Sequence, residues 1–175
     1  MMADLRYPIG PFVKPDTYDA ASRSAAIDRI AGVPRRLRGA VDGLGPRQLD
    51  TQYRPGGWTV RQVVHHLPDS HMNSYVRFKR TLTEDQPVVC TYHEDRWAEL
   101  PDGKTGPIEV SLDLLEALHL RWVAVLRSLT PEHLARTLDH PEIGILSLDA
   151  MLALYAWHGD HHIAHITSLR EREGW

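Results

Sequence analysis

Residues 155–166 read Tyr-Ala-Trp-His-Gly-Asp-His-His-Ile-Ala-His-Ile. This stretch holds four of the eleven histidines of the chain: His158, His161, His162 and His165. Met151, Tyr155, His158, His162 and Ile166 recur at helical spacing along one stripe. Side chains four residues apart lie on the same face of a helix, one turn from each other. The stretch therefore predicts a core helix that directs His158 and His162 towards a single point.

A second histidine cluster lies in the sequence Val64-His65-His66-Leu67-Pro68-Asp69-Ser70-His71. Neutral imidazole is the commonest metal ligand in proteins. Two histidines of one helix and a third from elsewhere make a three-histidine site with an open coordination position, which is typical of catalytic metal sites. His66 lies next to core residue Leu67 and in line with Val63, so it is the favoured third ligand, and His65 is the fallback.

Two alternatives to this ligand set stay open. His161 and His165 form a second pair at i and i+4, rotated away from the stripe of His158 and His162. The histidines can also form a packed hydrogen-bonded network without a metal. Burying two imidazoles side by side costs desolvation, so we favour a metal site.

Two acidic residues, Asp69 and Asp160, lie close to the histidine clusters in the sequence. Each is a candidate for holding a ligand histidine through its second ring nitrogen, or for serving as a general base. Both are equally compatible with solvated acids on a helix surface. Neither cluster has a glutamate after its first histidine, which excludes the HExxH zinc-protease motif.

Helix signals divide the chain into four long segments. Apolar spacing predicts a first helix over residues 19–44, with a kink or break at Pro34. Thr59 and Gln62 form a capping box that begins a second helix, which runs to about residue 83. Ser111 and Ser147 are N-caps for a third helix to about residue 129 and a fourth to about residue 173. The pattern predicts an all-α four-helix bundle, whose interior commonly holds metal sites.

The connection over residues 84–110, between the second and third long helices, is unusually long. Connections of this length are uncommon unless they cover a site, so Tyr92, His93 and Trp97 are candidates for lining a pocket. A short helix is expected near residues 95–100. Beyond the third helix, residues 130–132 predict an extra helical turn and residues 138–146 a small hairpin.

Composition bounds the class of protein. The 175 residues, 42% apolar and 25% charged, predict one globular domain over 1–175. A net charge of −3 argues against a nucleic-acid partner. Cys90 is the only cysteine, which excludes an intramolecular disulfide and fits a reducing compartment. The leader over residues 1–18 has no signal-peptide pattern, and no apolar window is long enough to span a membrane, so a cytoplasmic location is expected.

Two segments resemble a known family. The sequence Trp-Thr-Val-Arg-Gln-Val-Val-His-His-Leu at 58–67 resembles the W-[ST]-x-x-x-x-[LV]-x-H-L segment of the DinB-like superfamily. His-Gly-Asp-His-His-Ile-Ala-His-Ile at 158–166 is similar to its H-x-x-x-H-x-x-[QH]-I segment. Longer strings at 56–66, 69–75 and 155–159, together with Tyr-Pro-Ile-Gly at 7–10, resemble the YfiT branch. Pro68 stands where the family pattern leads us to expect a small residue.

The resemblance implies a homodimeric four-helix bundle with one divalent metal per subunit, zinc or nickel, held by His66, His158 and His162. Members of the branch are described as metal-dependent hydrolases or as S-transferases that use the low-molecular-weight thiol bacillithiol. Relatives use mycothiol or glutathione. The metal would activate water or a thiol against a small-molecule substrate. The alternatives are a non-catalytic metal-binding or stress-related dimeric bundle, and a thiol-dependent isomerase.

Overall fold

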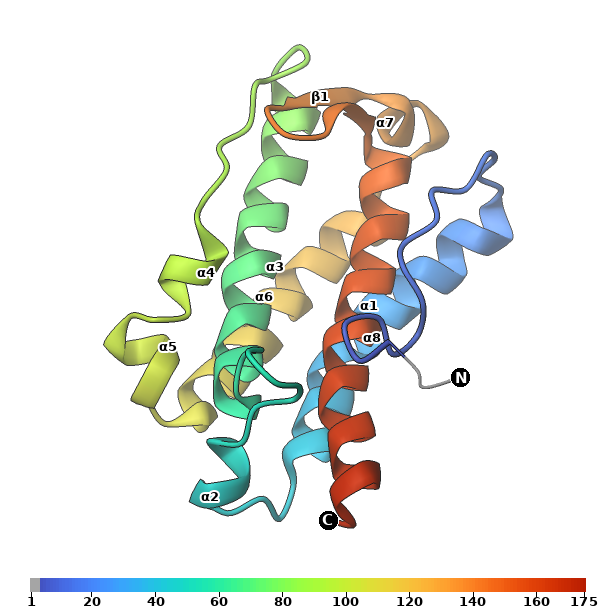
Figure 1. The fold of residues 1–175 in the computed structure, drawn as a ribbon. Helices are drawn as coiled ribbons and strands as arrows, with labels where there is room; N and C mark the ends of the chain where they lie inside the picture. The colour runs from blue at the N-terminus through green and yellow to red at the C-terminus, as the bar shows by residue number, and fades with distance from the viewer. Residues whose placement is uncertain (1–3) are drawn as a thin grey trace.

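Four long helices build the molecule in the computed structural model, which describes residues 4–175 (Figure 1). They are α1 (Ala20–Val41), α3 (Val60–Thr83), α6 (Ile108–Arg127) and α8 (Leu148–Glu173). Each packs against two others, in the order α1, α8, α3, α6 around the bundle. The predicted all-α four-helix bundle is confirmed. The first three residues of the predicted leader lie outside the described residues.

The helices begin where side chains satisfy their first N–H groups. The Thr59 side chain accepts a hydrogen bond from the backbone N–H of Gln62, as the capping box predicts. Ser147 accepts from the backbone N–H of Ala150 at the start of α8. These two caps fix the first turns of α3 and α8, the helices that carry both histidine clusters.

The predicted start of the third long helix is wrong. Helix α6 begins at Ile108, with Pro107 at its N-cap, and Ser111 lies inside its first turn. The Ser111 hydroxyl lies 2.7 Å from Nδ1 of His65, so a tertiary contact uses the oxygen that the sequence suggested for a cap. A fixed φ at Pro107 leads the chain into the helix without a side-chain cap.

Neither interior proline ends its helix. Helix α1 continues through Pro34 and α3 continues through Pro68, so the break considered at Pro34 does not occur. Val33 and Leu37 on either side of Pro34 are fully buried in the bundle. Tertiary packing of such side chains provides most of the stability of a helix in a protein and outweighs one missing hydrogen bond.

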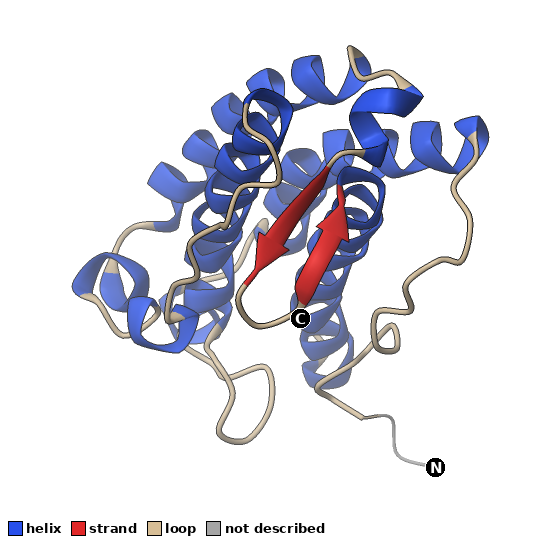
Figure 2. Ribbon diagram, turned by 90° about the horizontal axis from the view of Figure 1, so that it is seen from above, coloured by secondary structure: helices blue, strands red, loops and turns tan. Residues whose placement is uncertain are grey.

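Short elements connect the long helices. Helix α2 (Pro46–Leu49), which the sequence did not predict, follows α1. The long crossover carries α4 (Glu94–Trp97) and α5 (Pro101–Thr105) along the outside of α3 (Figure 1). Helix α7 (Pro131–Ala135) leads into an antiparallel hairpin of β1 (Thr137–His140) and β2 (Gly144–Ser147), close to the predicted turn and hairpin. Figure 2 shows this hairpin in front of the helices when the bundle is seen from above.

The core has two apolar halves with a histidine layer between them. One half includes Val63, Leu67, Leu115 and Ile166. The other half includes Ile30, Phe78, Trp122, Leu138 and Met151. Along α3, α6 and α8, the segments that join the two halves carry the buried histidines His71, His119 and His162, and His66 lies at the edge of the first half, next to Leu67. The bundle therefore encloses a polar layer near mid-length.

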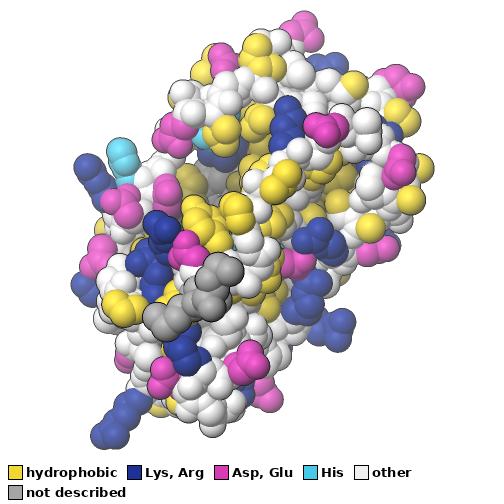
Figure 3. Space-filling model, turned by 45° about the vertical axis from the view of Figure 1, so that its right-hand side comes forward, with side chains coloured by type: hydrophobic (Ala, Val, Ile, Leu, Met, Phe, Trp, Pro, Cys, Tyr) yellow, Lys and Arg dark blue, Asp and Glu magenta, His cyan; other side chains and the backbone are white. Residues whose placement is uncertain are grey.

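The surface carries charges of both signs. Figure 3 shows basic and acidic side chains mixed over one face, with hydrophobic side chains gathered towards its centre. Within residues 4–175, none of the helices combines the length and apolarity that crossing a membrane requires.

Candidate metal centre

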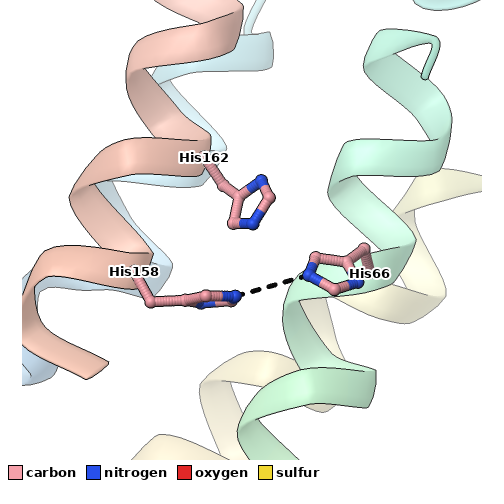
Figure 4. Close-up of side chains that lie close together, drawn as sticks. All are labelled: His66, His158 and His162. Atoms are coloured by element: carbon pink, nitrogen blue, oxygen red, sulfur yellow. Dashed lines mark hydrogen bonds between the residues drawn. The ribbon is translucent and has the colours of Figure 1, made fainter. Parts of the chain in front are cut away.

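Three histidines from two helices meet inside the bundle. His66 extends from α3, and His158 and His162 extend from α8 one turn apart (Figure 4). One ring nitrogen of each lies within 4.8 Å of the corresponding nitrogens of the other two. The Nε2 atoms of His66 and His158 are 3.4 Å apart. The structure thus brings together the three residues that the sequence favours as ligands.

The spacing of two of these nitrogens matches that of ligands on one metal ion. Two nitrogens bound to one tetrahedral zinc at about 2.0–2.1 Å are separated by roughly 3.4 Å. The Nε2 atoms of His66 and His158 stand at that separation. Nδ1 of His162 is buried and has no hydrogen-bond partner among the described residues. Nδ1 of His161 and of His165 lack a partner in the same way, so this feature is shared by the three neighbouring histidines of α8.

The environment keeps the three imidazoles neutral. Burial lowers the pKa of His66 to about 3. Burial, followed by the neighbouring histidines, lowers the pKa values of His158 and His162 well below the ordinary histidine value. Neutral imidazole is the form that binds metals, and these rings are held in that form at neutral pH.

The histidine group opens into a cavity of about 310 Å³. The other residues that line it are Trp58, Ser70, Arg77, Thr91, Tyr92, Glu94, His140, Glu142, Ile143, Met151, Leu154 and Tyr155. Arg77 is buried, and its Nη2 donates to the carbonyl of Cys90 at 2.7 Å. Its guanidinium forms no ion pair with a carboxylate among residues 4–175. The guanidinium of Arg77 therefore lies in the cavity wall without a direct ion pair, in a wall that also contains the carboxylates of Glu94 and Glu142.

Three further histidines of the two clusters, His65, His161 and His165, face other partners. Nδ1 of His65 contacts Ser111, and its Nε2 contacts the Gly106 carbonyl. His161 stacks on Trp157 with ring centroids 4.3 Å apart. His165 stacks on Tyr53 at 4.0 Å, and its Nε2 lies 3.1 Å from the Arg6 carbonyl. Within the described chain, no further histidine, cysteine or acid joins the group of His66, His158 and His162.

The two candidate acids lie outside the cavity wall. Asp160 forms ion pairs with Arg29 and Arg36 of α1, so its carboxylate is directed to the α1–α8 surface. Asp69 is half-buried, and burial followed by the charge of Asp102 raises its pKa to about 6. The acids that line the cavity are instead Glu94 and Glu142.

Part of the cavity wall was predictable from the sequence. Tyr92 lines the cavity as predicted, whereas His93 and Trp97 do not belong to its wall. Arg77 and Glu142 were missed. Arg77 had a weak signal, since it lies one residue before core residue Phe78 in the C-terminal third of α3. Glu142 had none, because the hairpin that carries it folds back over the cavity from a distant part of the chain.

The likenesses of the chain to known proteins agree with this geometry. A family model described as the DinB superfamily matches residues 29–166. A relative from Bacillus mycoides, named "Putative metal-dependent hydrolase", is 55% identical over 174 residues. The match covers 99% of this chain and the whole length of the relative. A Bacillus anthracis relative with that name is 54% identical over the same shares.

Solved structures give the same picture. YfiT from Bacillus subtilis, described as "a probable metal-dependent hydrolase with an unusual four-helix bundle topology", matches with a TM-score of 0.96 and 49% identity over 99% of each chain. The four-helix bundle protein TT2238 matches with a TM-score of 0.58 and 22% identity, over 83% of this chain and 98% of its own, which shows the fold alone. The family match over most of the chain and the close relatives confirm the resemblance drawn from the two histidine segments. The chain belongs to the DinB superfamily.

Proposed function

We propose that this protein is a metal-dependent hydrolase in which His66, His158 and His162 hold one divalent metal ion per subunit. The observation that carries the proposal is the group of three buried imidazoles whose ring nitrogens lie within 4.8 Å of one another at a cavity. The names of the Bacillus relatives support hydrolysis.

The chemistry follows from an open three-histidine set. A divalent metal there supplies a Lewis acid that lowers the pKa of a coordinated water or thiol. His65, His161 and His165 contact other groups, which argues against a closed structural site with a fourth histidine. Glu94 and Glu142 stand in the cavity wall and can accept a proton from the nucleophile, the role that the sequence analysis considered for Asp69 and Asp160.

The cavity also suggests the kind of substrate. Its volume of about 310 Å³ suits a small molecule. Tyr92, Tyr155 and Trp58 offer aromatic surface. Arg77 offers a buried guanidinium that forms no direct ion pair among the described residues and can bind an anionic group. We therefore propose a small substrate that combines an apolar part with an anionic group.

The finer predictions concern the metal, the nucleophile and the assembly. An all-imidazole donor set suits zinc, with nickel as the alternative. Sulfur transfer from a low-molecular-weight thiol would use the same open position, so it is the second candidate reaction. A homodimer in the cytoplasm stays a prediction of the sequence and of the family resemblance.

The test is metal analysis of untagged protein purified without added metal. Wild type is expected to hold about one equivalent of zinc or nickel. His162→Ala is expected to lose it, and the matched control His161→Ala to keep it, because His161 is a buried neighbour on α8 outside the group. Circular dichroism checks that each variant is folded. A folded wild type that carries no metal and takes up no added zinc would contradict the proposal.

The loaded protein is then assayed against small esters and amides, with and without added thiols. Turnover without a thiol, lost in His162→Ala, identifies hydrolysis. Turnover that depends on a thiol, with the thiol found in the product, identifies S-transfer and overturns hydrolysis as the reaction.

A further inference from the structure

Behind the three-histidine group lies a row of imidazoles that leads to the opposite side of the bundle. We propose that His119 is a positioning residue: through His71 it fixes the ring of His158 as the Nδ1–H tautomer, which leaves the Nε2 lone pair of His158 free to bind metal. The inference rests on the metal site proposed above.

Three contacts make up the row. Nδ1 of His158 lies 3.2 Å from Nε2 of His71. Nδ1 of His71 lies 2.8 Å from Nε2 of His119. Nδ1 of His119 lies 2.9 Å from the backbone carbonyl oxygen of Ile30. The row thus runs from α8 through α3 and α6 to α1, and each imidazole uses both of its nitrogens.

The carbonyl at the end of the row determines every proton position in it. A carbonyl oxygen can only accept, so Nδ1 of His119 carries the hydrogen. A neutral imidazole has one N–H, so Nε2 of His119 is bare and accepts from Nδ1 of His71. The same step makes Nε2 of His71 an acceptor for Nδ1–H of His158. Nε2 of His158 then has a free lone pair, which points at His66.

The Ser70 hydroxyl leaves the Nε2 lone pair of His158 available. Its oxygen lies 3.4 Å from Nε2 of His158, but its hydrogen is donated to the hydroxyl oxygen of Tyr155 at 3.5 Å. His158 is therefore the member of the group whose coordinating nitrogen the protein selects by hydrogen bonding. His162 differs, because its Nδ1 has no partner among the described residues.

Pro34 explains why the carbonyl of Ile30 is available. In a regular helix, the N–H of residue 34 would donate to the carbonyl of residue 30. Proline has no N–H, so it leaves this acceptor without its usual helical donor. The Nδ1–H of His119, from α6, donates to it instead. The proline in the middle of α1 thus creates the acceptor that ends the row.

The spectroscopic test reads the tautomer directly. In metal-free wild type labelled with ¹⁵N in histidine, two-dimensional NMR is expected to show His158 with a protonated Nδ1 and a bare Nε2. His119→Phe removes the acceptor for His71 and is expected to give His158 a mixture of tautomers. His119→Gln provides a side-chain oxygen as acceptor and is expected to restore the Nδ1–H form. A merely structural role for His119 would change the melting temperature without changing the tautomer.

Metal titration gives the second readout. His119→Phe is expected to bind zinc roughly 10- to 100-fold more weakly than wild type, as with other losses of groups that orient metal-bound histidines. His119→Gln is expected to recover most of that loss. The control is His65→Gln, a similarly buried histidine beside His66 that belongs to other contacts, and its affinity is expected to stay at the wild-type value.

The possible failures are distinguishable. An Nε2–H tautomer of His158 in the wild type, or unchanged zinc affinity in a folded His119→Phe, overturns the inference. If wild type shows the Nδ1–H tautomer but binds no metal, the function proposed above fails, and so does the positioning role. If wild type binds metal and both His119 variants bind it with the affinity of wild type, only the positioning role fails.

Discussion

At the scale of single residues, Asp69 is a half-buried carboxyl whose pKa is raised to about 6, first by burial and then by the charge of Asp102. Because the folded protein binds this proton more tightly than the unfolded chain does, the free energy of unfolding falls as the pH rises. The contribution of Asp69 is fully present below the unfolded pKa near 3.8 and is lost as the pH rises through the folded pKa of about 6. We expect Asp69→Asn to raise the free energy of unfolding at pH 7 by about 1 kcal/mol, after a discount for partial exposure.

Urea unfolding at pH 7 and at pH 3.5 checks this expectation. The gain from Asp69→Asn is expected at pH 7 and is expected to vanish at pH 3.5, where the carboxyl is protonated in the folded protein. The exposed Asp16→Asn is the control and is expected to change stability little at either pH. An equal gain at both pH values would show that the charge is not its cause.

The histidine group was predictable residue by residue, and its surroundings were not. The spacing of His158 and His162 on an apolar stripe and the place of His66 beside Leu67 depend only on helix geometry. His119 is the only histidine of α6, so no cluster in the sequence predicted a role for it. Its position one turn after core residue Leu115 indicated only that it is buried. The pairing of Asp160 with arginines depends on how α1 packs against α8, which local sequence does not specify.

At the scale of elements, α1 and α8 come into close contact at Gly159, next to His158. A Cβ atom on Gly159 would lie 2.5 Å from Cγ2 of Val33. We expect Gly159→Ala to lower the free energy of unfolding by about 1–3 kcal/mol, because one helix must move away from the other. Chemical denaturation measures the change.

Gly39→Ala is the matched control, since it also replaces a glycine of α1 or α8. A Cβ on Gly39 meets nothing within 4 Å. This variant is expected to stabilise the protein by roughly 0.5–1 kcal/mol, because alanine loses less conformational entropy in a helix than glycine does. A loss of stability in both variants would mean that helix contact is not the reason.

The helices themselves follow from local signals more closely than their contacts do. The caps at Thr59 and Ser147 placed the starts of α3 and α8 correctly. Ser111 failed as a cap signal because its hydroxyl contacts His65 from another helix. The residues around Ser111 do not show that its hydroxyl has a partner on another helix, so the local sequence could not exclude it as a cap.

At the scale of the whole molecule, the histidine layer joins α3 and α8 between two apolar halves of the core. A ligand that binds only the folded state stabilises it, by about 2.7 kcal/mol at a concentration 100 times its Kd. For a protein of this size, we expect zinc at that excess to raise Tm by roughly 5–10 °C. Calorimetry with zinc and with a chelator measures the shift, and an equal rise in His162→Ala would place the stabilising ion elsewhere.

The position of Trp58 has a practical consequence. Its indole ring lies 4.7 Å from the imidazole of His66 and 6.3 Å from that of His162, centroid to centroid. An indole reports changes in the charge and electronic structure of groups at such distances through its light emission. A paramagnetic ion such as nickel, held by these imidazoles, would quench the fluorescence of Trp58. The chain has five tryptophans, so the part of the emission that nickel quenches in the wild type but not in Trp58→Phe is the signal of an occupied histidine group, read without any added dye.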